Sequence, residues 1–197
     1  MSGPDPAIRR ADLAMDAERA EEVLSTGHCG RLGTTGPDGW PYVVPLLYVW
    51  SDRTIYVHNS GAAGHLSRNI DADGRACFLV DEPGSVYGYG RFECDTALSY
   101  RSVMAFGRIE RVSSRERKAR FCDELMRKYG AGIAGRPAHV YPRLDHIAVF
   151  ALRPERISGK EIRLPAAAGR WPATDRTRSP HVDVAEGHGR TASGDSG

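Results

Sequence analysis

Polar side chains suited to holding a flat polar ring gather in two stretches of the sequence. The first is the end of a predicted strand, IYVHN, which closes on His58 and Asn59, and the second is residues 87–112, YGYGRFECDTALSYRSVMAFGRIERV. A histidine at an apolar strand end can donate a proton, and Ser102 offers a hydroxyl group. Neither stretch shows a nucleophile beside a base, a set of metal ligands or a phosphate-binding glycine loop. The pattern favours ligand binding on β-structure.

A third candidate lies in the turn and short predicted helix GHLSRNIDAD, residues 64–73. His65 would stand at the start of this helix, where free backbone N–H groups and the helix dipole favour an anion. Leu66 and Ile70 lie one helical turn apart and predict an apolar face. Arg68 is a further cation in the same turn of helix.

Each of these residues also has a purely structural interpretation. His58 can be a strand-end histidine whose hydrogen bonds are made within the protein, and His65 can be a solvent-facing residue near the helix N-terminus. Ser102 can be a small residue beneath a packed neighbour. The sequence alone leaves these alternatives open.

Composition excludes several classes of function. The chain has 197 residues, with 27 basic and 25 acidic side chains, a net charge of +2 that argues against a nucleic-acid-binding domain. No apolar run approaches the roughly 18 residues of a membrane span, and the first residues show no apolar signal-peptide core, so we expect a cytoplasmic protein. The four cysteines are widely separated, and we expect neither zinc nor a structural disulfide.

Hydrophobic periodicity and turn residues predict a mainly β (α+β) protein. Asp16 and Gly27 are the expected N-cap and terminator of a first helix, and a capping box, Ser113 with Glu116, opens a later helix that runs to Tyr129. The turn GPDG predicts a hairpin, and Pro45 predicts an edge or a bulge in its strand. The expected strands are 29–35, 40–51, 54–60, 75–82, 100–112 and 146–159.

Six strands with tight hairpins favour an antiparallel barrel flanked by helices over a parallel sheet. We expect a flexible N-terminus over 1–11 and one domain over 12–164. From Pro165 onward few residues can be buried, so residues 165–197 are predicted to be a disordered tail.

Over about residues 9–163 the sequence resembles the flavin-binding split-barrel superfamily that includes pyridoxamine 5'-phosphate oxidase, with most likeness to its nitroimidazole-resistance (Nim-like) branch. The resemblance rests on the order of several motifs: GRLGTTGPDGWPYVVPLLYVW, IYVHNSGAAGH, ACFLVDE, YRSVMAFGRI and ISGKE. It implies a six-stranded antiparallel split β-barrel. It also implies a homodimer with FMN at the subunit interface, and some relatives use deazaflavin or haem instead.

The resemblance also assigns roles by position. It implies that the flavin ring lies along Val44, Pro45 and Leu46, that Val57, His58 and Asn59 touch the ring or its ribityl chain, and that the turn at Gly64, His65 and Leu66 holds the phosphate. Ser102 matches a position that hydrogen-bonds the ring, with Tyr100 and Arg101 beside it. His58, His65 and Ser102 are then expected to converge on one guest where two subunits meet.

One residue departs from the family pattern. At Leu66 the family commonly has Lys, and a leucine cannot neutralise a phosphate. His65, Arg68 and Arg31 are the candidates to replace that charge.

The function that the resemblance implies is an FMN-dependent oxidoreductase that uses NAD(P)H to reduce a small acceptor, such as a nitroaromatic compound, with His58 as proton donor. The alternatives are a non-enzymatic flavin or haem carrier or sensor, in which His58 or His65 would be the haem ligand, and a structural dimer with an empty site. The sequence leaves the choice between NADH and NADPH open.

Overall fold

The computed structural model describes residues 8, 10–61, 64–89, 94–130, 135 and 137–166. Two compact units are distinguished, Met1–Ser85 with Leu98–Leu164 and Val86–Ala97 with Pro165–Gly197. The described residues of the second unit are the far ends of two strands and residues 165–166, so the fold below is that of the first unit. The predicted flexible N-terminus and disordered tail fall almost wholly outside the described residues, and the domain boundaries at 12 and 164 stay a prediction.

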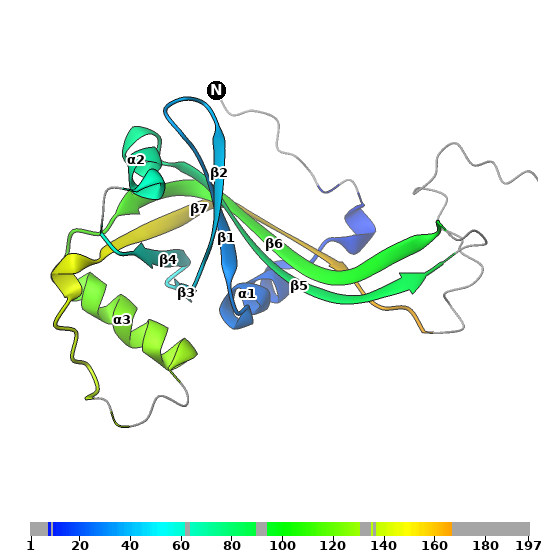
Figure 1. Cartoon of the computed structure of the whole chain (residues 1–197). Coiled ribbons are helices and arrows are strands. Elements are labelled where there is room, and N and C mark those ends of the chain that lie inside the picture. Colours follow the sequence, from blue (N-terminus) through cyan, green and yellow to red (C-terminus); the bar gives the residue numbers. More distant parts are fainter. Residues whose placement is uncertain are drawn as a thin grey trace, which may run out of the picture. The chain divides into compact units, whose positions relative to one another are not determined.

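Helices and strands follow one another in a mainly β order (Figure 1). They are η1 (Ala11–Leu13), α1 (Ala17–Thr26), β1 (Gly30–Thr35), β2 (Pro41–Leu46), β3 (Tyr48–Ser51), β4 (Thr54–Asn59), α2 (His65–Ala72), β5 (Arg75–Gly88), β6 (Thr96–Arg111), α3 (Arg115–Tyr129), η2 (Leu144–His146) and β7 (Ala148–Ile162). Among the described residues, no helix is both long and apolar enough to cross a membrane.

The described strands form one seven-stranded sheet in the order β2-β1-β5-β6-β7-β4-β3. Each strand pair whose register is described is antiparallel. β2 and β3 are the two edges of this sheet, yet only Leu47 separates them in the chain. The sheet must therefore curl until its edges meet, which confirms the expected barrel.

The expected count of six strands was wrong, because the predicted strand 40–51 is two strands. Leu46 still pairs with Gly30 of β1, whereas Tyr48 already pairs with Val57 of β4, so the chain changes partner at Leu47. Pro45 lies in the edge strand β2, as predicted, where a missing backbone N–H group is tolerated.

Local sequence accounts for most of the element ends. The Asp16 carboxylate accepts a hydrogen bond from the backbone N–H of Arg19 at 2.8 Å, and α1 ends before Gly27, as expected. The second cap is one residue later than predicted. Ser114, not Ser113, accepts the bond from the Arg117 N–H at 3.2 Å, so α3 begins at Arg115.

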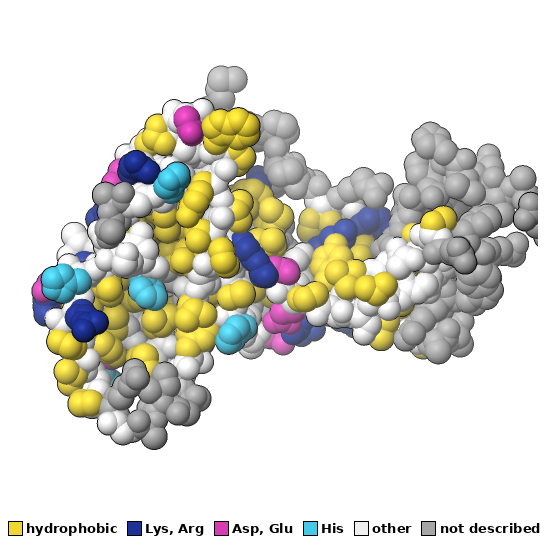
Figure 2. All heavy atoms as spheres, viewed as in Figure 1, with side chains coloured by type: hydrophobic (Ala, Val, Ile, Leu, Met, Phe, Trp, Pro, Cys, Tyr) yellow, Lys and Arg dark blue, Asp and Glu magenta, His cyan; other side chains and the backbone are white. Residues whose placement is uncertain are grey.

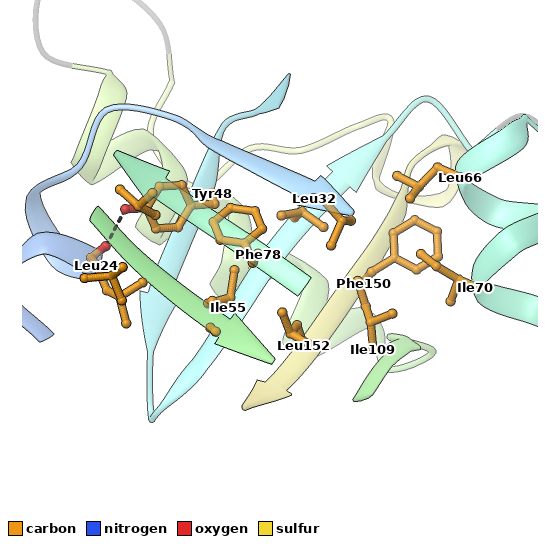
Figure 3. Close-up of a cluster of buried hydrophobic side chains, with 14 of the residues drawn as sticks. Leu24, Leu32, Tyr48, Ile55, Leu66, Ile70, Phe78, Ile109, Phe150 and Leu152 are labelled. Atoms are coloured by element: carbon orange, nitrogen blue, oxygen red, sulfur yellow. Dashed lines mark hydrogen bonds between the residues drawn. The ribbon is translucent and has the colours of Figure 1, made fainter. Parts of the chain in front are cut away.

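Two hydrophobic clusters hold the sheet and helices together. The first fills the inside of the curled sheet and includes Leu24, Leu32, Tyr48, Ile55, Leu66, Ile70, Phe78, Phe150 and Leu152. Figure 3 shows the Tyr48 ring among these side chains, with its hydroxyl donating to the carbonyl of Leu24 at 2.6 Å. Each fully buried side chain of this size contributes about 1.5–3 kcal/mol.

The second cluster packs α3 against the other side of the sheet. Phe121 and Cys122 of α3 meet Val49, Val149 and Ala151 of the strands, and α3 lies beside β3 and β4 in Figure 1. Along β4, Ile55 and Val57 belong to the first cluster, and Tyr56 packs on the second. The strand alternation thus divides the sheet into an inner side and a helix-covered side.

Gly107 is required by the pairing of β6 with β7. The register shifts between Phe106 and Gly107, and a Cβ atom on Gly107 would lie 2.0 Å from the Arg153 carbonyl oxygen. We expect Gly107→Ala to lower the free energy of unfolding by about 2–3 kcal/mol, since the backbone must move. Urea unfolding measures this. The control is Gly88→Ala, whose Cβ would meet only the Asp95 oxygen at 3.8 Å, and equal stability of the two variants would contradict the assignment.

Candidate functional site

One side of the sheet carries apolar side chains that the core does not use. In β1, Leu32 and Thr34 are buried on the inner side, which directs Arg31 and Gly33 to the opposite side, called here the outer face. In β2 the alternation is Tyr42, Val44 and Leu46 toward the core, with Val43 and Pro45 exposed. Figure 2 shows hydrophobic side chains gathered over β1 and β2 on the side of the molecule in view.

The outer face continues from β2 across β1, β5 and β6. Val43 pairs with Gly33, which pairs with Cys77 of β5, and Pro45 pairs with Arg31. On β6, the core residues Val103 and Ala105 alternate with side chains of the outer face. The outer face is therefore formed by Val43, Pro45, Arg31, Gly33, Cys77, Leu79, Ser102, Met104 and Phe106.

Arg31 already has a partner on this face. Its Nη1 lies 2.5 Å from Oδ1 of Asp81, and both side chains are about one-third exposed. The pair balances its own charge, so Arg31 is a poorer candidate to replace the lysine that Leu66 displaces.

Ser102 lies at the β6–β7 side of the outer face. It pairs in register with Lys160, whose Nζ lies 5.7 Å from the centre of the Tyr100 ring. Arg101 points the other way, where it forms ion pairs with Glu82 and, at 3.6 Å, with Glu22. Of the three neighbouring residues, Ser102 and Tyr100 share the outer face and Arg101 does not.

The N-terminus of α2 lies against β2. The rings of His65 and Tyr42 stack with centroids 5.7 Å apart and an interplanar angle of 30°. Gly64 is the N-cap and supplies no side-chain acceptor, so the first N–H groups of α2 have no partner within the helix. Arg68 is exposed and forms no ion pair with any residue that the structure describes. This corner can hold an anion.

Leu66 has a structural role in the core. Its side chain is 5% exposed and belongs to the inner cluster with Ile70 (Figure 3). Val57 is buried in the same cluster at 1% exposure. For these two predicted cofactor-binding residues, only the backbone is available to a ligand, and the roles implied for them stay a prediction.

Asn59 connects the end of β4 to α2. Its Nδ2 donates to the Ser67 hydroxyl at 3.2 Å, and its Oδ1 accepts from the Gly61 backbone N–H at 3.0 Å. The structure thus brings Asn59, His65, Arg68 and β2 together around one helix end.

His58 lies elsewhere. Its ring centroid is 5.4 Å from that of Phe121 in α3, and its Nδ1 is buried without a hydrogen-bond partner among the described residues. Burial lowers the pKa of His58, so a neutral imidazole is favoured at neutral pH. This atom lacks a hydrogen bond, which a ligand or a second subunit can supply.

Within one chain, His58 and Ser102 do not meet. His58 pairs with Val149 and Ser102 pairs with Lys160, positions eleven residues apart along β7. At about 3.3 Å per residue, this separation is roughly 36 Å along the strand. The predicted convergence of His58, His65 and Ser102 therefore depends on a second subunit.

Two further features bear on the site. A groove of about 560 Å³ lies between η1, α1 and residues 154–159 of β7, and it contains none of the predicted site residues. Within the described part of the chain, no group of three or more His, Cys, Asp or Glu side chains could hold a metal ion.

Sequence reasoning missed Tyr42, Gly33, Cys77 and Lys160. Tyr42 and Gly33 could have been placed by strand alternation from Val44 and Leu32. The pairing of Lys160 with Ser102, by contrast, spans most of the β6–α3–β7 segment and leaves no local signal.

The half-buried imidazole of His58 predicts a pH dependence of stability. Because the folded-state pKa is lowered, the unfolded chain binds the proton more readily, and acidification through about pH 6.5 favours unfolding. We expect His58→Leu, which cannot titrate, to lose less unfolding free energy than the native chain between about pH 7.5 and pH 5.5. Urea unfolding at both pH values tests this, and equal losses would contradict it.

Comparisons with known proteins identify the family. The family model described as pyridoxamine 5'-phosphate oxidase matches residues 16–161. A search of curated proteins found no match. A solved putative 5-nitroimidazole antibiotic resistance protein from Bacteroides thetaiotaomicron is 21% identical, with a TM-score of 0.63 over 75% of this chain and 86% of that one.

Two other solved structures share the fold. The flavocytochrome Anf3 from Azotobacter vinelandii is 25% identical, with a TM-score of 0.69 over 80% of this chain and 73% of that one. A FAD and haem binding protein from Mycobacterium smegmatis is 22% identical, with a TM-score of 0.65 over 80% of each chain. The fold is thus the split barrel that the sequence resemblance implied, and the chain belongs to the pyridoxamine 5'-phosphate oxidase family.

Proposed function

We propose that this protein is an FMN-binding oxidoreductase that acts as a homodimer and reduces a small acceptor, such as a nitroaromatic compound, with NAD(P)H. The observation that carries the proposal is the corner between β2 and α2 in a chain of this family. There an exposed apolar strand lies beside a helix N-terminus that no described side chain caps, and the helix carries an exposed arginine. These are the surfaces that a flat ring and a phosphate need.

The residues present fit FMN. The free edge strand β2 offers an apolar surface for the ring, with Val43 and Pro45 on its outer face and Tyr42, on which His65 stacks, on its inner face. The first N–H groups of α2 and the guanidinium of Arg68 can bind the phosphate, with His65 held in place by its stacking on Tyr42. Arg68 then supplies the charge that Leu66 cannot.

FMN, when bound, would supply hydride and electron transfer between NAD(P)H and the acceptor. The side chains of this protein would bind and orient the reactants and exclude water from them. His58 is neutral and lacks a partner at Nδ1, so its ring can accept or hold a proton at that atom once a second subunit completes its surroundings.

A homodimer is supported by two features of the single chain. Large hydrophobic side chains remain exposed, with Trp40 74% and Val43 64% accessible and Leu47 and Met104 exposed as well. The separation of His58 from Ser102 along β7 also means that one chain cannot bring both to one ligand. A second copy can supply the missing half of the site.

A non-enzymatic carrier or sensor of flavin or haem is the second candidate. It is favoured by the relatives described as a flavocytochrome and as a FAD and haem binding protein. In this chain His65 has an exposed ring near the start of α2, where it could serve as an axial ligand.

The visible spectrum of the purified protein, followed by a turnover assay, tests the proposal. We expect flavin absorbance bands, FMN as the released chromophore by mass, and NAD(P)H oxidation that depends on a nitroaromatic acceptor. Flavin without NAD(P)H oxidation would support the carrier instead, and a Soret band would indicate haem. Protein that neither carries nor takes up flavin would exclude the proposal.

The same preparation is expected to sediment as a dimer at micromolar concentration. A monomer that still binds FMN tightly would contradict a site shared between subunits.

Arg68 gives a test of the phosphate position. We expect Arg68→Gln to weaken FMN binding by about tenfold or more, as for the loss of a charged hydrogen bond, and to leave riboflavin binding unchanged. Fluorescence titration with both flavins measures this. Arg120→Gln on α3 is the matched control, because Arg120 is exposed and pairs only with Glu116 at 3.6 Å among the described residues. Equal loss of both flavins would place the phosphate elsewhere.

A further inference from the structure

Lys128 carries an amine that the chain buries without a partner. The residue lies in the last turn of α3, and its Nζ is buried with no hydrogen bond to any residue that the structure describes. The residue as a whole is half-buried, so part of its aliphatic stem reaches the surface. An ammonium group has three N–H donors, and it is costly to leave them unpaired inside a protein. This amine therefore requires an explanation.

Two tyrosine rings surround the amine. The Nζ atom of Lys128 lies 3.7 Å from the centre of the Tyr48 ring and 5.3 Å from that of the Tyr129 ring. Both tyrosine hydroxyls are engaged elsewhere, since Tyr48 donates to the Leu24 carbonyl (Figure 3) and Tyr129 donates to the Tyr48 carbonyl at 3.0 Å. The amine thus meets the faces of the rings. These faces carry partial negative charge, so they favour a cation or a neutral group and disfavour an anion.

A lysine is an unusual choice for this position in this chain. Of the 27 basic residues three are lysines, Lys118, Lys128 and Lys160, and the others are arginines. Beside aromatic rings an arginine is the better cation, because its guanidinium is more weakly hydrated and stacks on them readily. A lysine offers instead an amine that can lose its proton, which an arginine in a protein cannot do. Burial lowers the pKa of Lys128 to about 8 and so favours that loss.

Reaction of the amine with a carbonyl compound would remove the donors that lack partners. The nitrogen of an imine carries no N–H group, and that of a protonated imine carries a single one. An acylated lysine would keep an N–H donor and add a carbonyl acceptor, and a carbamate would place an anion over the ring faces. Of these products the imine suits the surroundings of Lys128 best.

We propose that Lys128 is a site at which this protein binds small aldehydes covalently, as an imine at Nζ. The lone pair of Nζ forms a bond to the carbonyl carbon, the C–O bond breaks, and the oxygen leaves as water with the two protons of the amine. Nothing is oxidised or reduced. A lysine that is desolvated in an apolar pocket is activated for this reaction. The inference is independent of the proposed function, because none of the proposed flavin-binding residues takes part.

Imine trapping with acetaldehyde as the probe tests the proposal. The purified full-length protein is equilibrated with a range of acetaldehyde concentrations at about pH 7.5. Excess borohydride then reduces each imine to a stable secondary amine, and peptide mass mapping gives the occupancy at each lysine. We expect half-occupancy of Lys128 at an acetaldehyde concentration about tenfold or more below that for the other two lysines, because more of its amine is unprotonated.

The other two lysines are internal controls. Lys118 donates to the Ile147 carbonyl at 3.0 Å, and the Nζ of Lys160 lies 5.7 Å from the centre of the Tyr100 ring. Lys128→Arg is the matched variant, because it keeps a cation beside Tyr48 and cannot form an imine. It should melt near the native temperature and leave the labelling of Lys118 and Lys160 unchanged.

A lysine that is buried only for packing would give the opposite result, since its Nζ would be protected and Lys128 would be the least labelled of the three. That outcome, or equal occupancy of all three lysines, would overturn the inference and leave the proposed function standing. The preference for Lys128 should also disappear in protein unfolded by guanidinium chloride. If it persisted there, the folded site would not be its cause, and the inference would be overturned as well.

Discussion

The single residue between β2 and β3 constrains the rest of the structure. Leu46 is hydrogen-bonded into one edge of the seven-stranded sheet and Tyr48 into the other, with Leu47 alone between them. A flat sheet of seven strands would place its edges nearly 30 Å apart at about 4.8 Å per strand. The chain can close that distance only if the sheet curls on itself, and the curling creates an inside that must be filled.

Filling that inside determines which residues remain for a ligand. Leu66 and Ile70 of α2 pack in the inner cluster, so the side chain at position 66 is not available to a ligand. The same packing sets the N-terminus of α2 against β2 through the His65–Tyr42 stack. Arg68, on the exposed side of the helix, then remains as a cation near that end, while Arg31 is held by Asp81. Under the proposed function, Arg68 would supply the charge from two positions further along the helix.

Local patterns predicted the parts of this fold that depend on neighbours in sequence. The caps of α1, the hairpin at GPDG with Gly39 at a φ of 82°, and the edge position of Pro45 were all predicted correctly. The division at Leu47 was not, because WPYVVPLLYVWS is apolar throughout and a change of strand partner leaves no mark on periodicity. The helix cap is Ser114 and not the predicted Ser113. Either serine suits the position, so the local sequence does not distinguish them.

The candidate site was less predictable than the fold, since it depends on pairing between distant segments. Alternation alone could not show that His58 faces α3 and not β2, because both sides of β4 are covered. The register of β7 determines where His58 and Ser102 lie. It places His58 level with Val149 and Ser102 level with Lys160, at opposite ends of one long strand.

The register of β7 limits how one ligand could contact both His58 and Ser102. A long β7 keeps the two halves of the predicted site apart in each chain, so a ligand that touches both must lie across two chains. His58 faces α3, and its Nδ1 has no hydrogen-bond partner among the described residues, whereas Val43 lies on the outer face and is 64% exposed. Under the proposed function, a second chain would supply a neighbour to each of them.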